Sequence, residues 1–497
     1  MPRHTLVALA LLPVVALPAG AAEFIPSWDV NGVWSSNVFH TSTNEESDFS
    51  VRTGPTLRLR EAQGNVTYDL NYRPRYEAYA RLNELNGIDS LDQYLSAQGA
   101  WRVTPNTKIE ASDDFAYATN VTNLFDNTAL ISTLVLGRQR ITTNNAQASL
   151  TQRLGPLGNL SATVENQLVD YQDPRQANTT ATSGTLQFTR GFTPRLFAGV
   201  GAQIQRQDFT AVGPSPSRGT TVYQGFGLLK YQISPTWKIS AQAGPALVEP
   251  DPITVDTISL PTYLAVDPST CPKRADGTPI YIRFPQNAAE ICSPAFYRTQ
   301  GNAIAPVPGS TTLTDVPFVG DQSAGSSLNY FGRISIEKEW RLWHASLEYS
   351  RSASNSSGLN GSSVLDEFAG TITWTPSPLW SVSFDASYST QSALNKVPQQ
   401  EVALLPQEFS QVIGGLLLTA PYGIPLEVDT GKELTNPVEL TTIYFTLGGS
   451  RRISRRLSIS GSAMYWQQEL GGALQKTRSQ AIQVSIGFTW NFEPIPL

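Results

Sequence analysis

The stretch that decides the fold is residues 66–73, which read Val-Thr-Tyr-Asp-Leu-Asn-Tyr-Arg. Apolar and aromatic residues occupy every second position, and polar or charged residues fill the positions between them. Strict alternation is typical of a β-strand with one apolar and one polar face. The same alternation returns in later segments that begin at Trp237, Trp343, Trp380, Leu457 and Ile482.

The composition excludes several other classes of protein. Of the 497 residues, 15% are charged and 10% are aromatic, and the formal net charge is −6. A soluble multidomain protein carries about 25% charged residues, and a nucleic-acid binder is expected to be basic. Beyond the N-terminus, no run approaches the roughly 18 apolar residues of a membrane-spanning helix. A β structure that spreads its apolar residues by alternation fits these figures.

The N-terminus predicts export. Residues 1–22 combine Arg3, an apolar run over residues 6–17 and the small-residue site Ala-Gly-Ala at residues 19–21. This order is that of a cleavable signal peptide. The two cysteines, Cys271 and Cys292, then enter an oxidising compartment, and we expect them to form a disulfide.

Turns and loops of two lengths alternate along the rest of the chain. Eight short turns, several of which begin with Ser-Pro or Thr-Pro, alternate with nine longer links. Proline presets the backbone for a tight turn. Eight turns and nine links join eighteen strands, with an uncertainty of two. Residues 23–497 are therefore predicted to form an all-β, up-and-down antiparallel transmembrane barrel of 16–18 strands, with short periplasmic turns and long extracellular loops. A soluble sandwich or propeller would need two buried faces.

Two residues do not fit this pattern of strands and turns. Pro74 lies inside a predicted strand, so we expect a β-bulge there or a place near the membrane interface. Arg190 has the parity of the lipid-facing Leu186 and Phe188. It should therefore extend to the lipid headgroups, unless the register differs.

The barrel interior is the predicted functional region. Charged residues with inward parity cluster on the early strands, and small hydroxyls dominate the late ones. The candidate pore-lining residues are Arg52, Arg58, Arg60, Asp69, Arg73, Arg75, Glu77, Asp92, Arg102, Lys108, Glu110 and Asp114. The hydroxyl positions are Ser381, Ser383, Ser387, Ser458, Ser460 and Ser462, with Asp385 among them. The arginines either form a track for an anionic solute or pair with nearby acids, as Arg58 would with Asp69; pairing is the favoured alternative.

Two links are too long for simple connectors. They cover residues 247–326, which contain both cysteines, and residues 391–437, which contain the apolar run 412–418. Each either folds inward as a gate or packs against the other as an extracellular cap. Both alternatives are open.

No catalytic or cofactor site is predicted. After removal of the signal peptide only His40 and His344 remain as histidines, and they lie far apart in the predicted barrel. A Ser-His-Asp set and a metal-binding spacing of Cys or His are both absent from the sequence. The sequence therefore predicts a protein that is not an enzyme.

Residues 52–57 (Arg-Thr-Gly-Pro-Thr-Leu), residues 68–77 and the repeated Ser/Thr-Pro turns resemble the outer-membrane β-barrel porin family. That family includes barrels encoded beside exosortase and exopolysaccharide systems. The resemblance implies an outer-membrane location and, more loosely, a role in polysaccharide export, and it assigns no individual functional residue.

The last predicted strand also bears a resemblance. Phe488, Trp490 and Phe492 are similar to the aromatic C-terminal strand that barrel-assembly machinery recognises. Residues 493–497 follow it here, so the aromatic residue is not terminal.

Three hypotheses on function follow. The leading one is a non-enzymatic channel in the outer membrane of a Gram-negative bacterium that exports an extracellular polysaccharide. The second is a general or solute-selective porin, and the third is a structural or adhesive barrel with a plugged lumen. The partners expected under the first are outer-membrane lipid, barrel-assembly machinery, an anionic polysaccharide and periplasmic export components, with no nucleic acid and no cofactor.

Overall fold

The fold is described from a computed structural model. It describes residues 22–42, 45–61, 64–87, 91–119, 138–173, 176–210, 218–251, 258–261, 298–300, 303–305, 313–316, 326–354, 363–393, 399–400, 433–434, 439–471 and 476–496.

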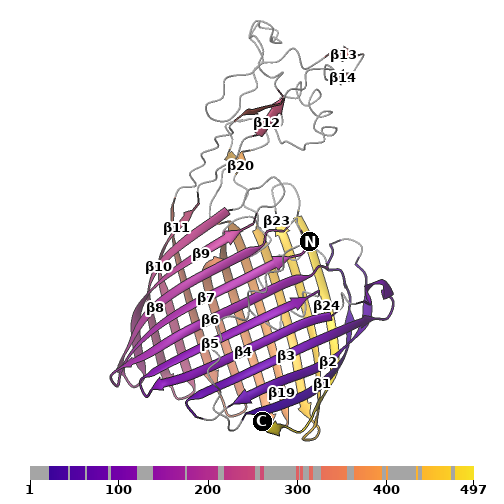
Figure 1. Ribbon diagram of the computed structural model, residues 1–497. Coiled ribbons are helices and arrows are strands. Elements are labelled where there is room, and N and C mark those ends of the chain that lie inside the picture. Colours follow the sequence, from indigo (N-terminus) through magenta and orange to yellow (C-terminus); the bar gives the residue numbers. More distant parts are fainter. Residues whose placement is uncertain are drawn as a thin grey trace.

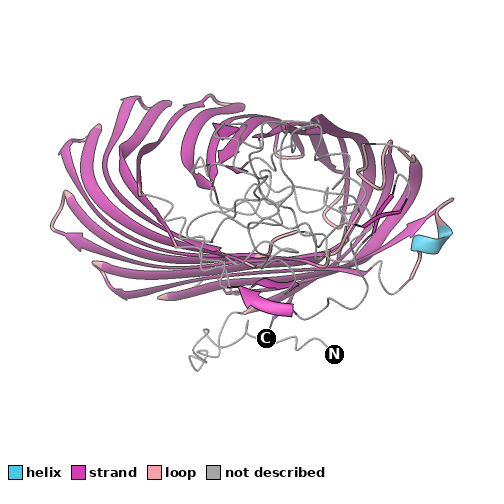
Figure 2. Cartoon of the chain, turned by 90° about the horizontal axis from the view of Figure 1, so that it is seen from above, coloured by secondary structure: helices cyan, strands magenta, loops and turns pink. Residues whose placement is uncertain are grey.

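Eighteen long strands form one antiparallel barrel (Figure 1). They are β1 (Glu23–Ser35), β2 (Asp48–Glu61), β3 (Val66–Tyr79), β4 (Leu91–Thr104), β5 (Thr107–Ala118), β6 (Ile141–Leu154), β7 (Gly158–Tyr171), β8 (Thr179–Thr193), β9 (Leu196–Phe209), β10 (Arg218–Ser234), β11 (Trp237–Pro250), β16 (Ser327–Glu339), β17 (Trp343–Ser354), β18 (Ser363–Ser377), β19 (Trp380–Ala393), β22 (Glu439–Arg452), β23 (Leu457–Gly471) and β24 (Lys476–Asn491). Each pairs with the next along the chain, and β24 pairs with β1, which closes the ring. Seen from above, the ring is oval (Figure 2). The predicted eighteen-strand barrel is confirmed.

Shorter elements accompany the barrel. They are η1 (Asn83–Leu85), β12 (Ile258–Pro261), β13 (Arg298–Gln300), β14 (Ala303–Ala305), β15 (Leu313–Val316), β20 (Gln399–Gln400), β21 (Glu433–Leu434) and β25 (Ile495–Pro496). β12 pairs with β15, β13 with β14, and β20 with β21. Within the described ranges, no helix has the length and apolar character needed to cross a membrane.

The two ends of the barrel differ in their connections. At one end, eight strand pairs are joined by no more than four residues each; we call this the turn end and the opposite end the loop end. Side-chain hydroxyls hold these turns: Thr193 Oγ1 accepts hydrogen bonds from the backbone N–H of Arg195 and Leu196 at 3.2 and 3.0 Å. Ser454 Oγ accepts in the same way from the backbone N–H of Arg456 and of Leu457, the first residue of β23. Such local bonds explain why the Ser/Thr positions recur at these turns.

The outer face of the barrel is apolar, as the alternation requires. Side chains such as Trp28 and Ile486 are 45% and 55% exposed. Tryptophans gather on this face close to the turn end, at positions 101, 237, 343, 380 and 490. We call the apolar region between this girdle and the loop end the outer belt. An apolar band flanked by aromatic residues is the arrangement of a barrel that spans a lipid bilayer.

The prediction of a bulge at Pro74 is wrong. The β2–β3 ladder runs as far as Thr53 opposite Tyr76 and resumes at Leu57 opposite Tyr72, so equal numbers of residues lie on each strand. What occurs is a gap in the hydrogen bonding, where Pro55 lies close to Pro74. The Arg75 guanidinium donates to the carbonyl oxygens of Pro55 and Pro74, at 2.7 and 3.1 Å. A side chain thus satisfies groups that the interrupted ladder leaves open.

Arg190 keeps the outward parity expected of it. It stands opposite Gly158, the first residue of β7, and therefore lies near the turn end. This position suits a guanidinium that reaches past the outer belt.

The first and last strands meet along a seam. β1 and β24 pair from Ser27 opposite Asn491 to Ser35 opposite Gln483. The residues after Phe492 extend this seam, because β25 pairs with the start of β1. From the sequence, residues 493–497 are only a departure from a family pattern. In the structure, Ile495 and Pro496 form a short strand.

Several predictions fall outside the described residues. They concern the signal peptide up to residue 21, the disulfide between Cys271 and Cys292, and most of the links 247–326 and 391–437.

Candidate functional site

The register places the predicted site residues on the inner face of the barrel. Leu59 and Leu70 stand opposite each other on the outer face, so their neighbours Arg60 and Asp69 face inward. The same parity continues through the β3–β4 and β4–β5 ladders. The residues that face inward on these strands are Arg52, Arg58, Arg60, Asp69, Arg73, Arg75, Glu77, Asp92, Arg102, Lys108, Glu110 and Asp114. We call this inner surface of β2–β5 the charged wall.

Two ion pairs of low exposure connect the charged wall across strands. Arg52 Nε donates to Glu77 Oε1 at 3.0 Å, and these side chains are only 13% and 3% exposed. Ser50 Oγ donates to the same carboxylate at 2.6 Å. Arg75 pairs with Asp29 on β1, and Thr56 accepts a further hydrogen bond from Arg75 at 2.7 Å. These buried groups hold one another and the three strands in place.

The pairing of Arg58 with Asp69 matches the prediction. Arg58 Nε donates to Asp69 Oδ1 at 2.8 Å, and a second guanidinium nitrogen bonds to the other carboxylate oxygen. Asp69 is the diagonal neighbour of Arg58 across the β2–β3 ladder, within reach of a long side chain. This bidentate contact neutralises the charge of one arginine of the wall.

Other charges on this wall are also accounted for. Lys108 Nζ lies 2.5 Å from Glu110 Oε1. Asp92 is 2% exposed and accepts hydrogen bonds from the backbone and hydroxyl of Thr119, at 2.8 and 2.9 Å. Asp114 stands opposite Ser96 and Asn145 in the register.

Three arginines of the charged wall are left over. In the described part of the chain, Arg60, Arg73 and Arg102 have no carboxylate partner at ion-pair distance. The Arg73 guanidinium lies 5.7 Å from the centre of the Tyr94 ring, a cation–π contact that leaves its charge in place. These side chains are the free positive charges of the wall.

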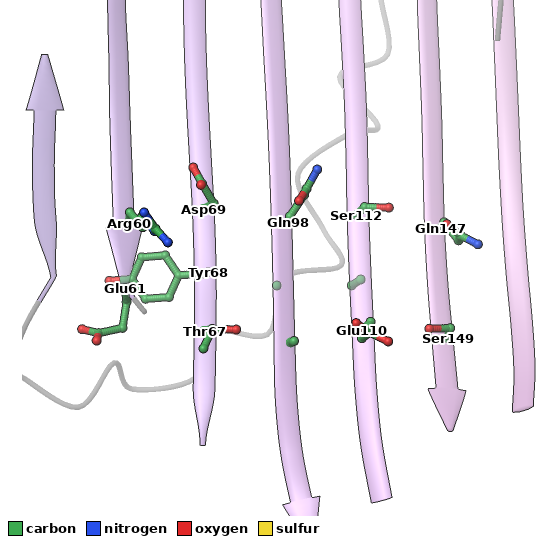
Figure 3. Close-up of a pocket in the computed structure, with 13 residues that line it drawn as sticks. Arg60, Glu61, Thr67, Tyr68, Asp69, Gln98, Glu110, Ser112, Gln147 and Ser149 are labelled. Atoms are coloured by element: carbon green, nitrogen blue, oxygen red, sulfur yellow. The ribbon is translucent and has the colours of Figure 1, made fainter. Parts of the chain in front are cut away.

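A cavity of about 740 Å³ opens on the charged wall (Figure 3). Arg60 and Asp69 lie at one side of it, with amide and hydroxyl side chains from β4, β5 and β6 beside them. Its inward-facing lining consists of Arg60, Thr67, Asp69, Gln98, Glu110, Ser112, Gln147 and Ser149. A lining of both charges with amides and hydroxyls suits a hydrophilic, polyhydroxylated solute.

The opposite inner surface has a different chemistry. The serines predicted there share one face of β19 and β23, and we call this surface the serine wall. Its polar groups bond locally: Ser462 and Ser485 lie 2.7 Å apart, and Thr371 donates to Asp385 at 2.8 Å. Short hydroxyl side chains project little from this wall and carry little charge.

Near the loop end, the barrel contains buried apolar side chains that the sequence did not predict. Ile141, Val169 and Trp466 have inward parity and are 0%, 3% and 1% exposed. They belong to a cluster with Ala116, Ala118, Tyr171, Met464 and Ala481. The signal was available as a break in alternation, since Tyr465 and Trp466 are adjacent and both aromatic.

The two histidines lie apart. His40 is 2% exposed, and its ring meets Trp466 edge-on at 5.4 Å. His344 stands in β17 near the turn end, opposite Thr373. Across the described ranges, no three His, Cys, Asp or Glu side chains group as metal ligands.

No protein-family model and no curated protein sequence matches the chain. Solved structures with a similar course include the outer membrane protein OpdK of Pseudomonas aeruginosa, at 8% identity and a TM-score of 0.39 over 94% of this chain and 99% of that one. OccK2 (OpdF) of the same organism gives 10% identity and 0.38 over 95% and 98%. The FrpB iron transporter of Neisseria meningitidis gives 10% and 0.38 over 94% and 81%. At these values the fold assignment rests on the strand register itself.

Proposed function

We propose that this protein is a non-enzymatic channel in the outer membrane of a Gram-negative bacterium and that hydrophilic solutes pass through its lumen. The observation that carries the proposal is the closed barrel with an apolar outer belt and a polar, charged inner face. A sheet closed on itself leaves no unpaired edge in lipid, and a polar inner face suits a lumen that holds water or a solute.

We further propose an acidic extracellular polysaccharide as the solute, exported with the help of periplasmic components. Two features support this choice. Arg60, Arg73 and Arg102 keep their charge, and a guanidinium binds carboxylates bidentately. The serine wall opposite offers short hydroxyls, past which a sugar chain slides without being held. Membership of the exopolysaccharide-associated porin family, which the sequence resembles, belongs to the same proposal.

A solute-selective porin is the second candidate. The cavity at Arg60 and Asp69 favours it, because a local set of both charges suits a small polar molecule rather than a polymer. The two candidates differ in how binding depends on the length of the sugar chain.

Current through single barrels in a planar bilayer tests the proposal. We expect an ion current that oligogalacturonate, an acidic sugar chain, blocks at lower concentration than a neutral maltooligosaccharide of equal length. The double variant Arg60→Gln, Arg102→Gln should weaken the acidic block about fivefold, because both side chains are exposed and each exposed charge contact contributes up to about 1 kcal/mol. Ser383→Ala is the matched control on the other wall.

Each outcome separates the alternatives. Absence of any current contradicts the channel itself. Equal block by both sugars rejects the acidic polysaccharide, and block that is independent of chain length favours the solute-selective porin.

A further inference from the structure

One part of the outer belt is not apolar. Asp113 lies on the outer face of β5, with the parity of Ile109 and Phe115. Its neighbours in the register are Ala97 on β4 and Ala146 on β6. It is six residues from Thr107, where β5 begins at the turn end, so its carboxyl group lies in the middle of the strand.

Further polar side chains surround Asp113 on the same face. Asn144 is next to it on β6, and Asn166 stands one strand further on, opposite Thr182 of β8. We call Asp113, Asn144, Asn166 and Thr182 the polar patch. Asn166 Nδ2 donates to Thr182 Oγ1 at 2.8 Å. Among the described residues, the Oδ1 atoms of Asp113 and Asn144 are buried without a hydrogen-bond partner.

Such groups are costly when they face lipid. Hydrocarbon supplies no donor for a carboxylate or amide oxygen, so each unsatisfied group raises the free energy of the barrel in the membrane. Polar residues at this depth are therefore expected to contact protein rather than lipid.

Several small side chains lie beside the polar patch, together with Phe115 and Leu168, which flank Asn144 in the register. The outer faces of β22 and β24 carry mostly large ones. The small residues are Ala111, Ala146, Ala148, Ala162 and Gly184. The large ones include Leu447, Ile482, Ile486, Phe488 and Trp490. Small residues let two membrane-embedded backbones approach closely.

We propose that the polar patch is the contact surface for a second copy of this chain; this rests on the proposed membrane location. The patch is self-complementary, because it holds both a carboxylate acceptor and amide donors. Ala146 is paired in the register with Asp113 on one side and Asn166 on the other. A two-fold axis along the membrane normal beside Ala146 therefore places the polar patch of each protomer against that of its partner.

Disulfide cross-linking in proteoliposomes tests this interface. Ala146→Cys should give a covalent dimer under mild oxidation, and Ala463→Cys, which lies on the outer face of β23, should not. The unsubstituted chain sets the background from its own two cysteines. Adding Asp113→Leu to Ala146→Cys should lower the dimer yield at least fivefold. Heat-modified gel mobility confirms that each variant forms a barrel, and leucine is well tolerated on a lipid-facing position.

Three results overturn the proposal: equal dimer yields from Ala146→Cys and Ala463→Cys, a yield that Asp113→Leu leaves unchanged, or a product in which the partner is another protein. Ion current through the same variants is measured in parallel. If a variant gives no dimer but still conducts, the proposed interface is rejected and the channel is not. If every variant fails to conduct, the proposed channel is rejected.

Discussion

The charged wall and the serine wall belong to the same sheet but are held together differently. On the serine wall, the β22–β23 ladder continues from Glu439 to Arg452 without a break. On the charged wall, the β2–β3 ladder is interrupted beside Pro55 and Pro74, and Arg75 bridges the gap. The comparison shows that part of the charge on the inner face replaces missing backbone hydrogen bonds. On the described part of the charged wall, Arg60, Arg73 and Arg102 are the arginines available to a solute.

The largest expected effect is on Arg75. Arg75→Met removes the partner of Asp29 and the donor to two carbonyl groups, all at a site where both charged side chains are at most 15% exposed. Leaving a buried carboxylate unpaired costs roughly 3 kcal/mol. Urea unfolding in lipid vesicles should show this loss in the free energy of unfolding. Arg60→Met, on the same wall without an ion pair, should unfold like the parent; an equal loss there would refute the distinction between the two kinds of arginine.

Glu77 gives an intermediate effect. Glu77→Gln keeps the shape of the side chain but removes the negative charge beside Arg52, so the wall gains one net positive charge. We expect the ratio of anion to cation permeability to rise about twofold, since a charged lumen concentrates its counter-ions. Reversal potentials in a salt gradient measure the ratio. A ratio that stays the same would mean that ions do not pass along this wall.

The serine wall gives the smallest effect. The double variant Ser383→Ala, Ser460→Ala removes two hydroxyls from an intact ladder. The free energy of unfolding should change by less than about 0.5 kcal/mol, and the reversal potential should stay at the parent value. A large change in the free energy of unfolding or in the reversal potential would show that the serine wall contributes to stability or ion selectivity as the charged wall does.

The alternation predicted the barrel because the pattern depends on residues that are neighbours along the chain. The strand count, the positions of the eight turns and the Arg58–Asp69 contact all follow from local spacing and one hairpin. The interruption at Pro74 did not follow, because it depends on which residue stands opposite across the ladder. The inward parity predicted for Asp114 is correct, and it implies that the adjacent Asp113 faces outward; the sequence analysis did not draw that consequence.

The seam between β1 and the last strands affects when the barrel can close. β1 begins at Glu23 and pairs with β2 on one edge, whereas its other edge pairs with β24 and β25, near the other end of the chain. Closing a loop of that length carries a large entropic cost, and nothing repays it until the last strand has been made. Every intermediate therefore keeps two open strand edges, which must be shielded from other chains until translation and export are complete.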